Sequence, residues 1–551
     1  MTKRTQLRIA LAAGTAALIA GSAQAVDFNI GELEAAFDTD LTWGLSMRTA
    51  KPDPVNQGVY GNRYLFQDKW DIFSNAIKGS HTFEVKGDSY GGLLRGNWFY
   101  DFEMANQNLP DAAENRAKQH GDITDAYVYK HLLPDQNLSV RLGKQVISWG
   151  ESTFIGQALS DINTVDISKL RTPGSDLKDA FLGTPAIDIA YTFAENYTLE
   201  GFYLFGYDEI KVDPMGAFFG TLDAISDGGG FANAVGGFGG SNTVNVPPGA
   251  FPRCVAPDGK PCDLLGGRLV RMGDDVPSGG GQWGLAFRVF LPSFGNGGEV
   301  GVYYQNMHDH LPSLSVMRNA VGPGGRFFIE YPENVERLGV SFNTNVAGVA
   351  LSGEYSWRRN APIQLIGPLL KGAGLPAPGA PLAPGATLRG FDRVERHQAQ
   401  LTINKNWGVT EWLKADANAT VAEVMWGWLG DMPPSSALFE PDISKDFGKL
   451  VVRHSMTYNA ALFNLIALEP SLAFSWDLHG FSNELGGAKL VVDDRKAITV
   501  GLGFLYGGGR WTGNISYTNF FGPQDDFNLA NSRYNGVDDR DFLAFNASYS
   551  F

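Results

Sequence analysis

Residues 541–551 read Asp-Phe-Leu-Ala-Phe-Asn-Ala-Ser-Tyr-Ser-Phe, and this stretch decides the fold class. Apolar and aromatic side chains occupy alternate positions, with small or polar side chains between them. Alternation with a period of two places one set on each face of a β-strand. An edge strand of an open sheet would expose its backbone to other chains, whereas a closed barrel has no edge. We therefore predict that the last strand closes a barrel.

This ending resembles the terminal strand of Gram-negative outer-membrane barrels, in which the final aromatic residue is part of the assembly signal. The resemblance implies the same role for Phe551. It also implies that the barrel-assembly machinery and the surrounding outer-membrane lipid and lipopolysaccharide are partners of the chain.

The opposite end of the sequence predicts export. Lys3 and Arg4 precede a short apolar stretch, and residues 23–25 (Ala-Gln-Ala) supply the small side chains of a cleavage site. About eleven apolar residues are too few for a membrane-spanning helix, which needs roughly 20. We interpret residues 1–25 as a signal peptide and residues 26–551 as an outer-membrane β-barrel with a loop constriction or plug.

Net charge bears on whether the chain binds nucleic acid, and cysteine content bears on whether it forms a disulfide. The net charge of −15 argues against nucleic-acid binding, because no basic cluster in the sequence offsets it. The two cysteines, Cys254 and Cys262, flank a turn at Pro257-Asp258-Gly259. In an oxidising exported compartment we predict a disulfide between them, since a zinc site would need two further ligands nearby.

Segments that alternate with a period of two recur along the chain and are joined by connections of two kinds. Short connections fall near 89–90, 134–136, 195–196, 292–297, 347–348, 406–410, 463–464 and 507–509. Long connections fall near 50–78, 107–120, 149–185, 208–281, 309–334, 359–394, 425–449, 478–494 and 521–540. Short and long connections alternate, as periplasmic turns and extracellular loops do in outer-membrane barrels.

The fold predicted from this pattern is all-β: a transmembrane antiparallel β-barrel of about 18 strands, with 16 as the alternative. Short turns lie on the periplasmic side and long loops on the extracellular side. The longest loop, with its core at 213–281, is expected either to fold into the barrel or to cap its mouth.

Residues 140–155 read Val-Arg-Leu-Gly-Lys-Gln-Val-Ile-Ser-Trp-Gly-Glu-Ser-Thr-Phe-Ile, and residues 163–178 read Asn-Thr-Val-Asp-Ile-Ser-Lys-Leu-Arg-Thr-Pro-Gly-Ser-Asp-Leu-Lys. These segments resemble the proteobacterial family catalogued as domain of unknown function 1302. The resemblance covers the mature chain and implies an outer-membrane location. It also implies a role with hydrophobic compounds such as steroids, hydrocarbons, aromatics or lipids, alongside a periplasmic partner and an inner-membrane transporter.

The same two segments supply the candidate site. Alternation points Arg141 and Gln145 into the lumen, and the strand is expected to end at the outer rim at Trp149. The loop that follows is long enough to fold back and pair with barrel residues. The candidate lumen or constriction residues are Arg141, Gln145, Trp149, Glu151, Arg171 and Asp176. Two interpretations stay open for them: a polar network that anchors the loop, or a constriction that contacts substrate.

Together these patterns predict an outer-membrane channel or transporter for small hydrophobic molecules. The alternatives are a general diffusion porin, and an export port or structural barrel that works with periplasmic and inner-membrane partners. No Ser–His–acid set is legible, so we predict that the protein is not an enzyme and needs no cofactor. The segment His308-Asp309-His310 has too few ligands for a metal, and we expect it to be solvated.

Overall fold

The computed structural model describes residues 26–53, 65–109, 111–133, 137–175, 177–220, 224–227, 229, 231–233, 268–320, 325–365, 382–435, 443–482, 484, 489–523 and 535–551. The predicted signal peptide and Asp176 lie outside these ranges, as do both residues of the predicted disulfide, Cys254 and Cys262.

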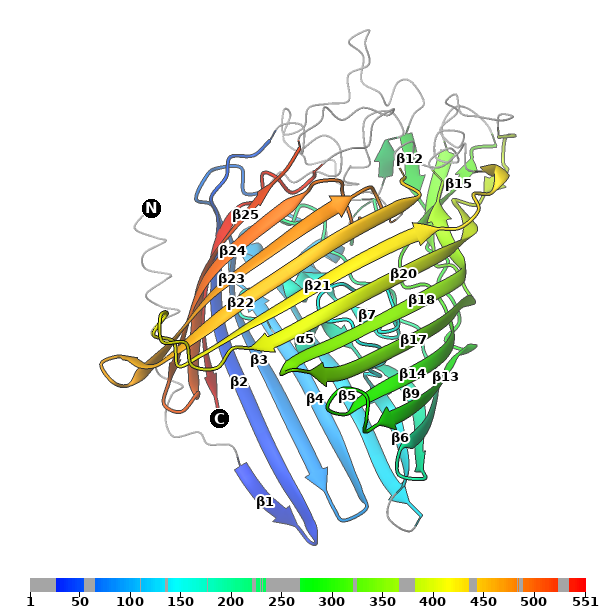
Figure 1. Cartoon of the computed structure of the whole chain (residues 1–551). Helices are drawn as coiled ribbons and strands as arrows, with labels where there is room; N and C mark the ends of the chain where they lie inside the picture. Colours follow the sequence, from blue (N-terminus) through cyan, green and yellow to red (C-terminus); the bar gives the residue numbers. More distant parts are fainter. Residues whose placement is uncertain are drawn as a thin grey trace.

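In the described part of the chain, 18 antiparallel strands form a closed barrel (Figure 1). Each strand pairs with the next along the chain, and the last strand pairs with the first, so that Ser550 lies opposite Asp40 and Phe542 opposite Arg48. The barrel strands are β2 (Leu33–Arg48), β3 (Ile72–Lys86), β4 (Tyr90–Asp101), β5 (Gln119–Leu132), β6 (Leu138–Gln145), β9 (Thr184–Phe193), β10 (Tyr197–Leu204), β13 (Gln282–Leu291), β14 (Gly298–Met307), β17 (Val335–Val346), β18 (Val349–Gln364), β20 (Phe391–Asn406), β21 (Ala417–Leu429), β22 (Asp446–Leu462), β23 (Ile466–His479), β24 (Lys496–Tyr506), β25 (Trp511–Phe521) and β26 (Phe542–Ser550). A further strand, β1 (Val26–Ile30), pairs with β2 alone.

The order of short and long connections is confirmed. The eight predicted short connections join strands at one end of the barrel, and the nine predicted long connections join them at the other. Figure 1 shows the short turns at the lower end and the longer segments at the upper end. The strand number is therefore 18, and the alternative of 16 is wrong.

The barrel wall is apolar outside and polar inside. Along β17, Leu338 and Val340 are 42% and 45% exposed, whereas Arg337 and Ser341 on either side of them are buried. An apolar outer face with a polar interior is the pattern of a barrel that lies in lipid, so the protein is an outer-membrane protein. Among the described residues, no helix is long and apolar enough to cross a membrane.

A second sheet of five strands forms from the long loops at the upper end of the barrel. We name it the cap sheet: β11 (Phe231–Asn233), β12 (Arg268–Arg271), β16 (Gly325–Glu330), β15 (Ser313–Arg318) and β19 (Thr387–Leu388). Leu314, Phe327 and Ile329 are fully buried in a core beneath it. The longest loop contributes β11 and β12, so that part of it belongs to the cap.

The connection between β6 and β9 runs inside the barrel, and we name residues 146–183 the lumen loop. It contains β7 (Thr164–Val165), α4 (Ile167–Leu170), α5 (Leu177–Ala180) and β8 (Phe181–Leu182). Figure 1 shows β7 and α5 behind the front wall of the barrel. Two short helices, η1 (Met104–Asn106) and α3 (Asp111–Lys118), precede β5.

Candidate functional site

Two carboxylates on the barrel wall hold the first part of the lumen loop. Glu423 on β21 accepts hydrogen bonds from the backbone N–H groups of Thr153, Phe154 and Ile155, at 3.0, 2.5 and 3.0 Å. Glu354 on β18 accepts from the backbone N–H of Leu159 at 3.2 Å and from that of Glu151. Glu423 is fully buried and Glu354 nearly so, and each gives backbone N–H groups of the loop an acceptor inside the barrel.

Gly150 allows the close approach of the loop to Glu354. Its φ is +84°, a left-handed conformation that side chains disfavour. A Cβ atom at this position would lie 2.3 Å from Glu354 Oε2 and 2.8 Å from Leu159 Cβ. The Trp-Gly-Glu-Ser segment therefore needs glycine for both conformation and space.

Trp149 packs against the inner wall below this turn. The structure ends β6 at Gln145, so the chain turns inward before Trp149 instead of reaching the outer rim as expected. The indole is 1% exposed, and its N–H donates to Glu200 on β10 at 2.9 Å. Its ring centroid lies 4.8 Å from that of Phe202 and 5.6 Å from that of Tyr303.

Asp161 attaches the middle of the loop to two arginines of the wall. Its Oδ2 accepts from Nη2 of Arg337 on β17 and from Nη2 of Arg358 on β18, each at 3.0 Å. Burial by itself raises the pKa of the Asp161 carboxyl, but the two guanidinium groups outweigh it and hold that pKa below its usual range. The carboxylate therefore stays charged at neutral pH.

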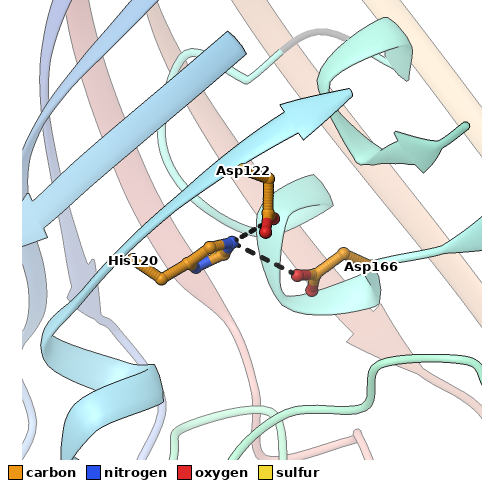
Figure 2. Close-up of side chains that lie close together, drawn as sticks. All are labelled: His120, Asp122 and Asp166. Carbon is orange, nitrogen blue, oxygen red and sulfur yellow. Dashed lines mark hydrogen bonds and ion pairs between the residues drawn. The ribbon is translucent and has the colours of Figure 1, made fainter. Parts of the chain in front are cut away.

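His120, Asp122 and Asp166 form the one group of metal-type ligands found in the described part of the chain (Figure 2). His120 Nε2 lies 2.7 Å from Asp122 Oδ2 and 3.9 Å from Asp166 Oδ2. Lys169 contacts Asp122 at 2.7 Å, and Arg116 contacts Asp166 at 3.1 Å. Because two cations already neutralise the two carboxylates, the group serves as an ion-pair link between the lumen loop and β5.

The far end of the loop reaches the strands that close the barrel. A Cβ atom at Gly44 on β2 would lie 2.5 Å from the Cβ of Pro173, and one at Gly174 would lie 2.9 Å from Asn546 on β26. Lys78 on β3 pairs with Asp179 at 3.2 Å. The lumen loop thus crosses the lumen from β6 to the closing strands.

The remaining predicted site residues are distributed along this path. Arg141 pairs with Asp188 on β9 at 2.6 Å, and the buried Gln145 donates to the carbonyl of Ala186 at 3.1 Å. Glu151 accepts from Asn343 at 2.8 Å, and burial raises the pKa of its carboxyl. Arg171 pairs with Asp213 and donates to the carbonyl of Phe219 at 3.0 Å.

A cavity of about 800 Å³ lies between the lumen loop and the wall formed by β22 to β26. Of the predicted site residues in the described ranges, Arg171 lines this cavity, whereas Arg141, Gln145, Trp149 and Glu151 do not. Apolar side chains come from the lumen loop, from the segments that lead into the cap sheet and from the wall: Phe154, Val165, Ile167, Leu170, Pro173, Ile210, Val212, Phe219, Ile225, Leu311, Pro312, Phe520, Val537, Phe542 and Ala544. Charged side chains gather on β22, on β23, in the loop before β24 and at the start of β24, and Asp161, Arg171 and Asp213 also line the cavity.

Sequence reasoning did not select Glu423 or Asp161, which hold the loop. A signal for Glu423 existed, because it alternates with the lipid-facing Val424 and Trp426 and so points inward. Asp161 lies in irregular chain, where no periodicity gives the direction of a side chain.

The expectation that His308-Asp309-His310 is solvated is wrong. All three residues are buried, because the segments beneath the cap sheet pack over them. The ring of His310 stacks on Tyr207 at 5.6 Å, and its Nδ1 lies 3.0 Å from Thr164 Oγ1 in the lumen loop.

A family model described as protein of unknown function, DUF1302, matches residues 6–551. No curated protein is significantly similar to the chain in sequence. Solved structures with a similar fold include OpdK, an outer membrane protein of Pseudomonas aeruginosa, at 8% identity and a TM-score of 0.43, covering 94% of this chain and 98% of that one.

Two further structures are similar to the same degree. OccAB4 of Acinetobacter baumannii has 9% identity and a TM-score of 0.44, covering 94% of this chain and 98% of that one. OccD3 (OpdP) of Pseudomonas aeruginosa has 10% identity and a TM-score of 0.38, covering 96% and 94%. The fold assignment rests on the closed strand order and not on these similarities.

Proposed function

Because this chain belongs to the DUF1302 family and folds as an outer-membrane barrel, we propose that it is a channel or transporter for small hydrophobic molecules. The observation that carries the proposal is the cavity between the lumen loop and the wall. Its volume of about 800 Å³ falls within the range of small-molecule sites, roughly 300–1,000 Å³. Most of its lining surface is apolar, so a solute that enters gains by burying its own apolar surface, at roughly 25 cal/mol per Å².

The anchored lumen loop supports selective passage. It is bonded to strands around the barrel, among them β5, β18 and β21. A general diffusion porin would need a wide aqueous lumen, and an obstructed one favours binding of a particular class of solute over free flow. Of the two alternatives, neither the porin nor the export port or structural barrel gains a specific observation from the described residues.

The proposal includes the partners that the sequence resemblances imply. Lipopolysaccharide and lipid surround the wall, the barrel-assembly machinery inserts it, and a periplasmic protein and an inner-membrane transporter work on the same cargo. These partners are predictions.

Entry of N-phenyl-1-naphthylamine into intact cells tests the function, because this apolar dye is held back by lipopolysaccharide and fluoresces once it reaches lipid. Cells that express the protein should take up the dye faster than cells with an empty vector. A hydrophilic β-lactam is the control and should enter both kinds of cell at the same rate. In planar bilayers the purified barrel should give little steady ion conductance. Equal dye uptake, together with a large conductance proportional to salt, would favour the porin instead.

A further inference from the structure

One wall of the cavity carries more positive than negative charge, although the chain as a whole has a net charge of −15. Lys449 on β22 and Arg495 before β24 both pair with Asp477 on β23. The neighbouring Glu484 is neutralised by Arg396 at 2.9 Å. Asp477 is therefore one carboxylate shared by two cations, which leaves an excess of one positive charge within this group of three. Lys489 and Lys496 line the same wall.

Both oxygens of the Asp477 carboxylate are engaged by donors of the wall. Its Oδ1 accepts from Lys449 Nζ at 2.7 Å, and its Oδ2 accepts from Arg495 Nε at 2.8 Å and from the backbone N–H of Val492 at 2.9 Å. The side chain is fully buried. Asp477 thus fixes both cations in place without cancelling them.

One nitrogen of Arg495, which lines the cavity, keeps its donors free. Its Nε and Nη2 are used by Asp477 and by the carbonyls of Lys489 and Leu490. Its Nη1 has no hydrogen-bond partner among the described residues, and the side chain lines the cavity at 16% exposure. A guanidinium with free N–H groups beside apolar surface is suited to bind an anion that water would otherwise solvate.

From this arrangement we propose that the cavity takes amphiphilic acids, in which a hydrophobic body carries one carboxylate, and that Arg495, supported by Lys449, binds the carboxylate. The body lies against the apolar side chains of the lumen loop and cap, such as Leu170, Ile225 and Leu311. This inference rests on the proposed function and names its substrate class. A neutral hydrocarbon would leave the cationic wall without a counter-charge.

Binding of 2-naphthoate and 2-naphthamide to the full-length barrel in nanodiscs tests the inference. The two probes share size and ring system, but 2-naphthoate is ionised at neutral pH and 2-naphthamide is not. Calorimetry should show 2-naphthoate binding about tenfold more tightly than 2-naphthamide, as a charge-assisted hydrogen bond predicts. Equal affinities would overturn the anion site but leave the hydrophobic channel standing, whereas binding of neither probe would count against both.

Substitutions test whether Arg495 causes the preference for 2-naphthoate. Arg495→Gln should remove the preference for 2-naphthoate and leave the affinity for 2-naphthamide unchanged, and Arg495→Lys should restore part of the preference. Arg359→Gln is the matched control, because Arg359 is 67% exposed and pairs with Glu336 away from the cavity. If Arg495→Gln does not fold into a heat-modifiable barrel, Lys449→Gln is tested instead. It should likewise reduce the preference for 2-naphthoate and leave the affinity for 2-naphthamide unchanged. An unchanged preference in a folded variant would overturn the assignment.

Discussion

Glu423 accepts a hydrogen bond of 3.0 Å from the backbone N–H of Ile155, although 268 residues separate them in the sequence. The same carboxylate accepts from the N–H groups of Thr153 and Phe154. One side chain of the wall therefore holds a full turn of the lumen loop. This contact explains how a long, irregular connection keeps its place inside the barrel.

Replacing Glu423 by Ala should loosen the lumen loop and raise the ion conductance of the barrel severalfold. Three backbone N–H groups lose their acceptor, at about 1–3 kcal/mol for each group left unsatisfied. Planar-bilayer recordings measure the effect. Glu469→Ala on β23 is the control, since it removes the same charge from a side chain that makes no hydrogen bond among the described residues. Equal conductance of the two variants would show that the loop stays in place without Glu423.

Replacing Trp149 by Ala should impair uptake of an apolar dye more than it lowers the amount of folded barrel. The buried indole packs on Phe202 and Tyr303, and removing it costs about 3–5 kcal/mol of local packing at the base of the loop. Trp149→Phe keeps most of that packing and loses the hydrogen bond to Glu200, so it should retain more uptake. A parallel fall of uptake and heat-modifiable protein in Trp149→Ala would make the role of Trp149 one of folding alone.

Deleting Phe551 should sharply lower the amount of folded protein in the outer membrane. Phe551 donates to the carbonyl of Thr39 at 2.9 Å and accepts from its N–H at 2.6 Å, so the deletion removes two hydrogen bonds from the seam of the barrel. Phe551→Tyr keeps the aromatic end and the backbone bonds and should behave as the wild type. Heat-modifiable migration of outer-membrane fractions measures both. Normal levels of the deletion variant would reject the assembly role of the terminal residue.

The stabilisation supplied by Asp161 should be lost only in acid. Arg337 and Arg358 hold the pKa of Asp161 below the ordinary value near 3.9, so the folded state binds its proton less readily than the unfolded state does. The difference in melting temperature between the wild type and Asp161→Asn should therefore be constant from neutral pH down to about pH 5 and shrink below pH 4. The exposed Asp431→Asn should show no such difference. A difference that already fades near neutral pH would contradict the pairing with the two arginines.

The barrel was predictable because its signals are local. Alternation along β17 or β26 identifies the face of each residue from its nearest neighbours, and connection lengths follow from where alternation stops. The site was predictable in part. Arg171 was placed on a loop that folds back, and it does line the cavity. Trp149 was expected at the rim because its segment continues the strand pattern, whereas the chain turns inward after Gln145.

From the sequence alone follow a closed wall of about 18 strands, their lipid and lumen faces, and the sides on which short turns and long loops lie, whereas the choice between 18 strands and 16 came from the structure. Each of these follows from a repeat two residues long, which can be read from adjacent residues without knowing where the rest of the chain lies. Only the tertiary structure decided which polar groups meet inside that wall. Lys449, Asp477 and Arg495 lie on separate strands and loops, and the sequence shows no basic cluster. The register of β22 against β23 places Lys449 opposite Asp477, and Asp477 also pairs with Arg495 just before β24, so pairing of neighbouring strands brings the scattered charges together in a cationic wall.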